Sequence, residues 1–241
     1  DDLHGMWNTV ETADLDSDGD IDFIFGNQGN NTAHKTSNEH PMKMWINDFD
    51  NNGTIEQIIT KNENGSDFPI HMKKELTAQL VSLKKQNIKA SEYAKKSIDK
   101  LFNKDIFDRS IIKQSTISET IIAENIGNNQ FQIIYLPNRV QFSCVCGIVC
   151  SDVNNDGNLD IIMAGNNFEF KPQYSRLDAN YGNVLLGDGN LNFTWQNYND
   201  SGFVIKNEAK QLRTIKTKNG ETYLVASVND EFPKIFLIND E

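Results

Sequence analysis

The sequence predicts a mainly β protein: a partial or fragmentary β-propeller of about three to four blades of antiparallel strands, with a helical insertion. Three observations predict this fold. An acidic loop motif occurs three times between short apolar segments, a second turn motif recurs about 60 residues apart, and one intervening stretch changes to helical periodicity. A repeat of about 60 residues that carries about four short strands is typical of one propeller blade.

The acidic motif places oxygen-bearing side chains at positions 1, 3, 5 and 9 and glycine at position 6. It defines loop A (residues 14–22), loop B (48–56) and loop C (152–160). Calcium takes six to eight oxygen ligands, position 7 can add its main-chain carbonyl, and glycine permits the sharp bend. We therefore expect about three Ca²⁺ ions, one in each loop. The predicted ligands are Asp14, Asp16, Asp18, Asp20 and Asp22 in loop A; Asp48, Asp50, Asn52, Thr54 and Glu56 in loop B; and Asp152, Asn154, Asp156, Asn158 and Asp160 in loop C.

Position 12 of the motif excludes an EF-hand. An EF-hand needs a bidentate glutamate there, whereas these loops have Phe25, Ile59 and Met163. The flanking segments are short and rich in β-branched residues, so each loop is expected to join two strands. The alternative is an ordinary hairpin turn rich in Asp, Asn and Gly, and it is strongest for loop B, which has fewer acids than loop A.

The first blade is expected in residues 1–66. Its strands fall near residues 10–14, 22–26, 42–47 and 56–60, and its two hairpins carry loops A and B.

Residues 67–107 are expected to form a helical insertion, because a propeller blade needs no helix. Leu76, Leu80 and Leu83 recur at helical spacing, and a second apolar stripe includes Ile98 and Leu101.

Residues 108–241 are expected to form further blades with one calcium loop. Two matching turn motifs, at residues 125–131 and 187–193, follow apolar strands, and Asn219-Gly220 predicts another hairpin.

Composition restricts the partners. The 34 acidic and 23 basic residues give a formal charge of −11, which repels nucleic acid, and no apolar run is long enough to span a membrane. The three cysteines are expected to be free thiols, because a disulfide framework or a zinc site needs more ligands. Three to four blades cannot close a ring, and the chain begins at Asp1. We therefore expect a fragment whose partners are the remaining propeller blades of a longer chain, or another surface protein.

The loop motif and the apolar strand after it, ending in Phe25-Gly26 or Ala164-Gly165, resemble the FG-GAP/VCBS repeat of calcium-binding β-propellers. Such repeats occur in integrin α-chain heads and many bacterial surface proteins. Residues 5–32, the helical segment that ends at residues 92–95, and residues 166–182 together also resemble the C-terminal region of long VCBS-repeat proteins exported by Bacteroidetes. The similarity extends between these stretches over most of the 241 residues. The resemblance implies an exported, extracellular cell-surface protein. The departures are Asn52 and Glu56 in loop B and a last repeat without a loop.

A ligand-binding surface is expected in residues 166–181, which are longer than a blade turn requires and mix aromatic, basic and acidic side chains. The alternative is that Arg176 and Asp178 pair and the aromatic rings pack on a neighbouring blade. The candidate ligand-binding residues are Phe168, Lys171, Tyr174, Arg176, Asp178 and Tyr181.

The sequence favours a calcium-stabilised module for binding or scaffolding, with a glycan as one candidate ligand. No catalytic residue is assigned, because the four histidines lack metal or triad spacing and no nucleophile motif occurs. The alternative function is a calcium-dependent propeller enzyme acting on polysaccharide, as a lyase or a glycosidase.

Overall fold

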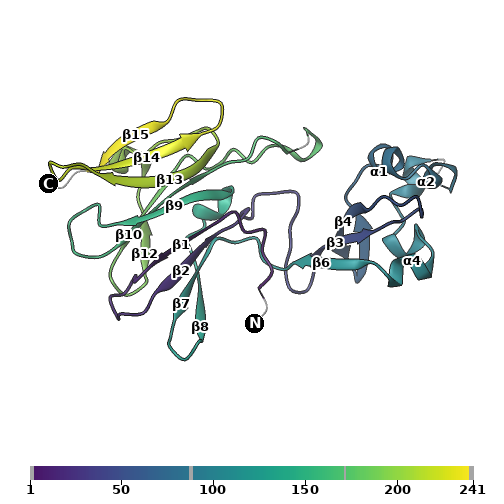
Figure 1. Ribbon diagram of the computed structural model, residues 1–241, viewed down its shortest axis with the longest axis horizontal. Helices are drawn as coiled ribbons and strands as arrows, with labels where there is room; N and C mark the ends of the chain where they lie inside the picture. Colours follow the sequence, from purple (N-terminus) through teal and green to yellow (C-terminus); the bar gives the residue numbers. More distant parts are fainter. Residues whose placement is uncertain (1–2, 87–88, 171, 239–241) are drawn as a thin grey trace. The chain divides into compact units, whose positions relative to one another are not determined.

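The computed structural model describes residues 3–86, 89–170 and 172–238, and their strands form four antiparallel sheets (Figure 1). The chain folds as two units. The inserted unit comprises residues 34–117 together with residues 3–5, and the main unit comprises residues 6–33 and 118–238. Each unit has its own hydrophobic core.

The main unit contains three sheets. Sheet 1 has the strand order β1-β2-β7-β8, sheet 2 the order β9-β10-β11-β12, and sheet 3 the order β13-β14-β15 (Figure 1). The strands are β1 (Thr9–Ala13), β2 (Asp22–Gly26), β7 (Ile121–Asn125), β8 (Phe131–Tyr135), β9 (Val145–Ser151), β10 (Asp160–Gly165), β11 (Asn183–Gly187), β12 (Phe193–Trp195), β13 (Ala209–Lys216), β14 (Thr222–Val228) and β15 (Lys234–Ile238). Three short helices, η2 (Val140–Phe142), η3 (Pro172–Tyr174) and α5 (Tyr198–Ser201), lie in the connections.

The three sheets stack face to face. One core lies between sheets 1 and 2 and includes Ile24, Ile161 and Met163. A second lies between sheets 2 and 3 and includes Ile162 and Leu224. Alternate residues of β10 thus point to opposite neighbours, which is why this strand is apolar at every position after Asp160. The first strands of the sheets contact in succession, β1 with β9 and β9 with β13.

Sheets 1 and 2 repeat the same plan. In each, a hairpin carrying an acidic loop is followed by a second hairpin. The two turn motifs near residues 125–131 and 187–193 form these second hairpins, as expected. Counting from the end of each acidic loop, Phe23 and Phe25 in sheet 1 hold the places of Ile161 and Met163 in sheet 2.

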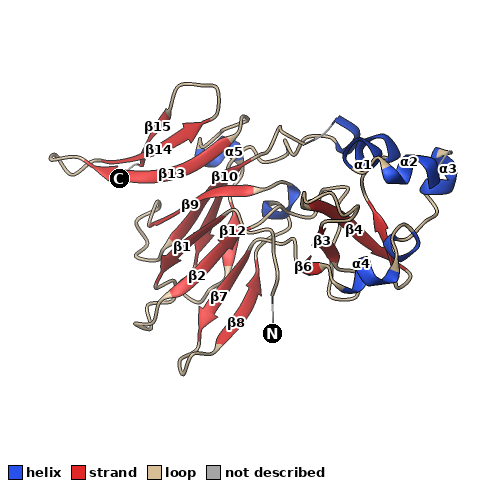
Figure 2. Cartoon of the chain, turned by 45° about the vertical axis from the view of Figure 1, so that its right-hand side comes forward, coloured by secondary structure: helices blue, strands red, loops and turns tan. Residues whose placement is uncertain are grey.

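The inserted unit has a sheet of order β5-β4-β3-β6 covered by short helices (Figure 2). Its elements are β3 (Met42–Asn47), β4 (Glu56–Glu63), β5 (Ser66–Pro69), α1 (Lys73–Gln79), α2 (Ser82–Gln86), α3 (Ala90–Tyr93), η1 (Ile98–Lys100), α4 (Lys104–Asp108) and β6 (Ile111–Ser115). The predicted inward stripe is confirmed, because all five of its members are buried in one core with Trp45 and Phe49. These members are Leu76, Leu80, Leu83, Ile98 and Leu101.

The observed division of the chain differs from the expected one of 1–66, 67–107 and 108–241. β1 and β2 pair with β7 and β8, whereas β3 and β4 pair with β5 and β6, so residues 1–66 contribute to two sheets instead of one blade. The insertion is correspondingly larger, residues 34–117. Both hairpins have the same local pattern, and nothing local specifies which distant hairpin completes each sheet.

The three cysteines are free thiols; Cys144 is buried and the other two are partly buried. Among the described residues, no helix is long and apolar enough to cross a membrane.

Candidate metal centres

Each acidic loop joins two paired strands: loop A joins β1 to β2, loop B joins β3 to β4, and loop C joins β9 to β10. Two left-handed residues bend every loop. At position 4 these are Ser17 (φ 61°), Asn51 (φ 56°) and Asn155 (φ 58°), and at position 6 they are Gly19 (φ 96°), Gly53 (φ 88°) and Gly157 (φ 89°). Left-handed backbone strains most residues and not glycine, which accounts for the glycine at position 6.

The same hydrogen bonds organise all three loops. In loop C, the Asp152 carboxylate at position 1 accepts the N–H groups of Asp156 (3.3 Å) and Gly157 (2.9 Å), and Asp160 at position 9 accepts that of Val153 (2.8 Å). The corresponding bonds are present in loop A and in loop B. Position 5 accepts the N–H of position 7 in every loop. The loops are therefore built around side-chain oxygens, unlike a two-residue hairpin turn that bonds backbone to backbone.

The carboxylate at position 9 is buried in all three loops. In loops A and C its second oxygen links the loop to the rest of the sheet. Asp22 Oδ1 accepts the N–H of Asn125 at 2.9 Å, and Asp160 Oδ1 accepts the N–H of Gly187 at 2.9 Å. Asn125 and Gly187 end β7 and β11, so the two repeated motifs of the sequence meet through this carboxylate. The sequence contained a sign of this contact, because Asn125 and Gly187 both occupy the first place of the second turn motif.

Carboxylates converge in two of the loops. Carboxylate oxygens of Asp14, Asp16 and Asp18 lie within 4.8 Å of one another, and so do those of Asp48, Asp50 and Glu56. Loop C has an amide at position 3. There Asn154 Nδ2 donates to Asp156 Oδ2 at 2.9 Å, and within the described residues this loop forms no such three-acid cluster.

Loop B also contains an unsatisfied oxygen. Oδ1 of Asp50 is buried, and no hydrogen-bond donor reaches it in the part of the chain that the structure describes. A buried carboxylate oxygen without a donor is costly unless a cation compensates it. Loop B, whose composition departs most from the motif, therefore combines a cluster of three acids with a buried carboxylate oxygen that lacks a donor among the described residues.

The loop carboxylates also disfavour one another's ionisation. Burial, together with the nearby charges of Asp18, Asp22 and Asp14, raises the pKa of Asp16. Burial and the charges of Asp16, Asp22 and Asp18 likewise raise the pKa of Glu124 on β7. Glu124 is a residue that the motif did not indicate, because it lies about 100 residues from loop A in the sequence. A divalent cation at loop A would relieve this repulsion.

Loop C shows two opposite shifts. Burial raises the pKa of Asp160, and the charges of Asp156 and Asp152 add to this, although the N–H groups of Val153 and Gly187 oppose it. The N–H of Asn158 and the Asn154 amide hold the pKa of Asp156 below its usual value. Asp156 therefore stays ionised more readily than Asp160.

The donor set of all three loops is oxygen alone, the set that hard cations such as calcium and magnesium prefer. The residues present fit a bound calcium ion. Side chains at positions 1, 3, 5 and 9 would hold it together with the main-chain carbonyls of Asp20, Thr54 and Asn158, and the ion would supply charge neutralisation.

The structure does not bring the described members of the expected ligand-binding set together in one cluster. Arg176 pairs with Asp178 (Nε to Oδ2, 2.9 Å), which is the ion pair of the alternative, and its guanidinium lies 4.6 Å from the ring centroid of Phe168 in the same segment. Tyr174 lies in η3, and Lys171 lies outside the described residues. Tyr181 instead joins a different aromatic group, with its ring 6.0 Å from that of Tyr198.

No family model, no curated protein and no solved structure matches this chain.

Proposed function

We propose that this chain is a calcium-stabilised β-propeller module of the FG-GAP/VCBS type, acting in binding or scaffolding at the outer cell surface. One observation carries the proposal: the same nine-residue loop, lined by oxygens and held by the same hydrogen bonds, occurs in three places. Independent repetition of a geometry that suits calcium is hard to explain by turn chemistry alone.

The stacking of the sheets supports the propeller. Blades of a propeller pack face to face with their first strands nearest a common axis. Sheets 1, 2 and 3 pack face to face, and β1, β9 and β13 contact in succession. We therefore propose that the three sheets are consecutive blades and that the inserted unit is carried between the second and third strands of the first one.

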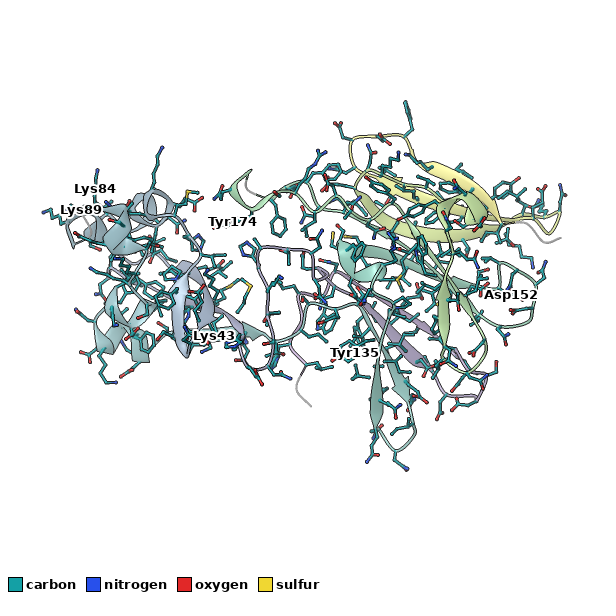
Figure 3. The ribbon with its side chains drawn as sticks, turned by 180° about the vertical axis from the view of Figure 1, so that it is seen from behind. Lys43, Lys84, Lys89, Tyr135, Asp152 and Tyr174 are labelled. Carbon is teal, nitrogen blue, oxygen red and sulfur yellow. The ribbon has the colours of Figure 1, made fainter. Side chains whose placement is uncertain are left out.

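The two outermost faces of the stack support further blades. Val10 on the free face of sheet 1 is 53% exposed, whereas Ile148, at the same place in sheet 2, is 2% exposed. Tyr135, labelled in Figure 3, is exposed on the same free face. The free face of sheet 3 exposes Ile235 and Leu237. Contiguous exposed apolar surface usually marks an interface, and we propose that blades of a longer chain or of another surface protein cover both faces.

Substitution of Val10 and Ile148 measures the difference in burial between the corresponding faces of sheets 1 and 2. In the 241-residue chain, Val10→Ser should change the free energy of unfolding by less than about 0.5 kcal/mol, because the side chain is already exposed. Ile148→Ser should cost about 3 kcal/mol or more, because it removes buried methyl groups and buries a hydroxyl. Urea unfolding of both variants gives the comparison. Equal costs would mean that the face of sheet 1 is already covered in this chain.

An extracellular location follows from the proposed metal. Calcium loops of extracellular modules bind with dissociation constants of about 10⁻⁴–10⁻³ M, a range that suits millimolar calcium outside the cell. The ion's proposed role is structural, because it would hold the loop ends of the strands at fixed positions.

The test is the number of bound ions. Equilibrium dialysis at about 10 mM calcium, at least tenfold above the expected dissociation constants, should give close to three ions per chain, and Asp14→Ala, Asp48→Ala and Asp152→Ala should each lose one. Asp188→Ala is the matched control. Asp188 also accepts backbone N–H groups in a tight turn, from Asn190 and Asn192, but lies outside the three loops. Binding of no calcium by the folded wild-type chain, or loss of an ion in the control, would contradict the proposal.

A further inference from the structure

A row of aromatic side chains runs along the main unit at the connections between its strands. Trp195, the last residue of β12, lies edge-on to Tyr198 of α5, with ring centroids 5.3 Å apart, and Tyr198 lies 6.0 Å from Tyr181. Phe142 of η2 is linked to Trp195 through Arg139, whose guanidinium lies near both rings. Tyr181 and Phe142 are each 41% exposed, so both ends of the row reach solvent.

Two cations belong to this aromatic–cationic row, one between Trp195 and Phe142 and the other beside Tyr181. The Arg139 guanidinium lies 5.1 Å from the Trp195 ring centroid and 5.6 Å from that of Phe142, and Lys206 Nζ lies 5.6 Å from that of Tyr181. Both cations are exposed.

Neither cation has an acidic partner. Within the described ranges, no carboxylate lies at ion-pair distance from Arg139 or Lys206. Four other cations of the main unit do have one: Arg176, Lys210, Arg213 and Lys234. A chain of net charge −11 therefore keeps two unpaired cations together with four aromatic rings.

The middle of the row is held in place. Trp195 Nε1 donates to Asn183 Oδ1 at 3.0 Å, and buried Asn183 donates through Nδ2 to Asn180 Oδ1 at 3.1 Å. Fixing the indole before a ligand arrives lowers the entropy lost on binding. The row is thus preorganised at its centre and accessible at its ends.

We propose that the aromatic–cationic row binds an acidic polysaccharide that contains uronate sugars. The apolar C–H faces of pyranose rings pack on the aromatic rings, and the carboxylates pair with Arg139 and Lys206. Arginine suits a carboxylate because its planar fork donates two parallel hydrogen bonds. The inference rests on the proposed binding function and names its ligand class.

Uronate chains match the row better than nucleic acid does. Duplex DNA carries one charge about every 1.7 Å, which a chain of net charge −11 repels. A uronate polysaccharide spaces its carboxylates a sugar or more apart and offers an apolar ring face at each step, which corresponds to cations separated by aromatic rings.

The test is titration calorimetry with hyaluronan oligosaccharides, which carry carboxylates without sulfate, at fixed calcium. Hyaluronan should bind and neutral dextran should not. Arg139→Gln, Lys206→Gln and Tyr181→Ala should each weaken binding at least tenfold while the melting temperature stays unchanged. The matched controls, Lys218→Gln for an exposed cation and Tyr135→Ala for an exposed aromatic ring, should bind like wild type.

Three outcomes would overturn the proposal: no binding of hyaluronan, equal binding of dextran, or an equal loss in the control variants. A parallel titration with chondroitin sulfate distinguishes recognition of carboxylate from recognition of sulfate. Stronger binding of the sulfated chain would overturn the assignment to carboxylate. The number of bound calcium ions, measured on the same sample, separates failure of this inference from failure of the calcium proposal. If Tyr181→Ala unfolds, the exposed Arg139→Gln and Lys206→Gln variants decide the result.

Discussion

Removal of calcium should lower the melting temperature of the main unit by about 6–12 °C. A ligand that binds only the folded state stabilises it by about 1.4 kcal/mol for each site when its free concentration is about ten times its dissociation constant. Loops A and C both belong to the main unit, which gives about 3 kcal/mol, and a domain of this size shifts by about 2–4 °C per kcal/mol. Calorimetric scans with calcium and with a chelator measure the shift.

A substitution in loop B should change stability in opposite directions with calcium and without it. With calcium present, Asp50→Asn should destabilise the inserted unit, because it removes a ligand charge. In chelator the same substitution should be neutral or stabilising, because Oδ1 of Asp50 is then a buried anionic oxygen without a partner among the described residues. Asp188→Ala should respond to chelator like wild type. An unchanged melting curve after the metal is shown to be stripped would refute the calcium proposal.

Gly165→Ala should be the most damaging single substitution outside the loops. A Cβ atom at residue 165 would lie 1.9 Å from the backbone oxygen of Cys144, at the point where the pairing of β9 with β10 shifts register. Backbone cannot move aside as a flexible side chain can, so we expect a cost of about 3–4 kcal/mol. Urea unfolding measures it.

Gly202→Ala is the control for Gly165→Ala. Gly202 has φ 64° and no heavy atom within 4 Å of an added Cβ atom, so its substitution should cost only the left-handed strain of about 1–2 kcal/mol. If Gly165→Ala were no more costly than Gly202→Ala, the close approach of the two strands would not be a constraint on the fold.

Local features of this protein could be predicted from its sequence, because local chemistry determines them. The three loops follow from the spacing of acids around Gly19, Gly53 and Gly157. The strands on either side follow from their β-branched runs. The helical stripe of Leu76 and Leu80 follows from its period.

Features that join distant segments could not be predicted in this way. The pairing of Phe25 with Ile121 depends on which faces pack together after the whole chain has folded. Glu124 meets loop A only through that pairing. The aromatic–cationic row was missed for the same reason: Arg139, Tyr181 and Trp195 come from three separate parts of the chain, and only Tyr181 stood in a segment with a recognisable pattern.

The inserted unit has a consequence for the order of folding. In sheet 2 the chain from Asn166 to Gly182 connects the second and third strands, whereas in sheet 1 that connection runs from Asn27 to Thr120 and is roughly fivefold longer. Closing the longer loop costs about 1.5 kcal/mol more in chain entropy when it is unstructured. If the inserted unit folds first, the pairing of Met42 with Ser115 brings the two ends of this long connection together. The extra entropy cost of closing it is then removed before sheet 1 forms. Collapse of the inserted unit would then precede the pairing of β2 with β7, and substitutions in the core around Trp45 should slow the formation of sheet 1, which contains none of the substituted residues.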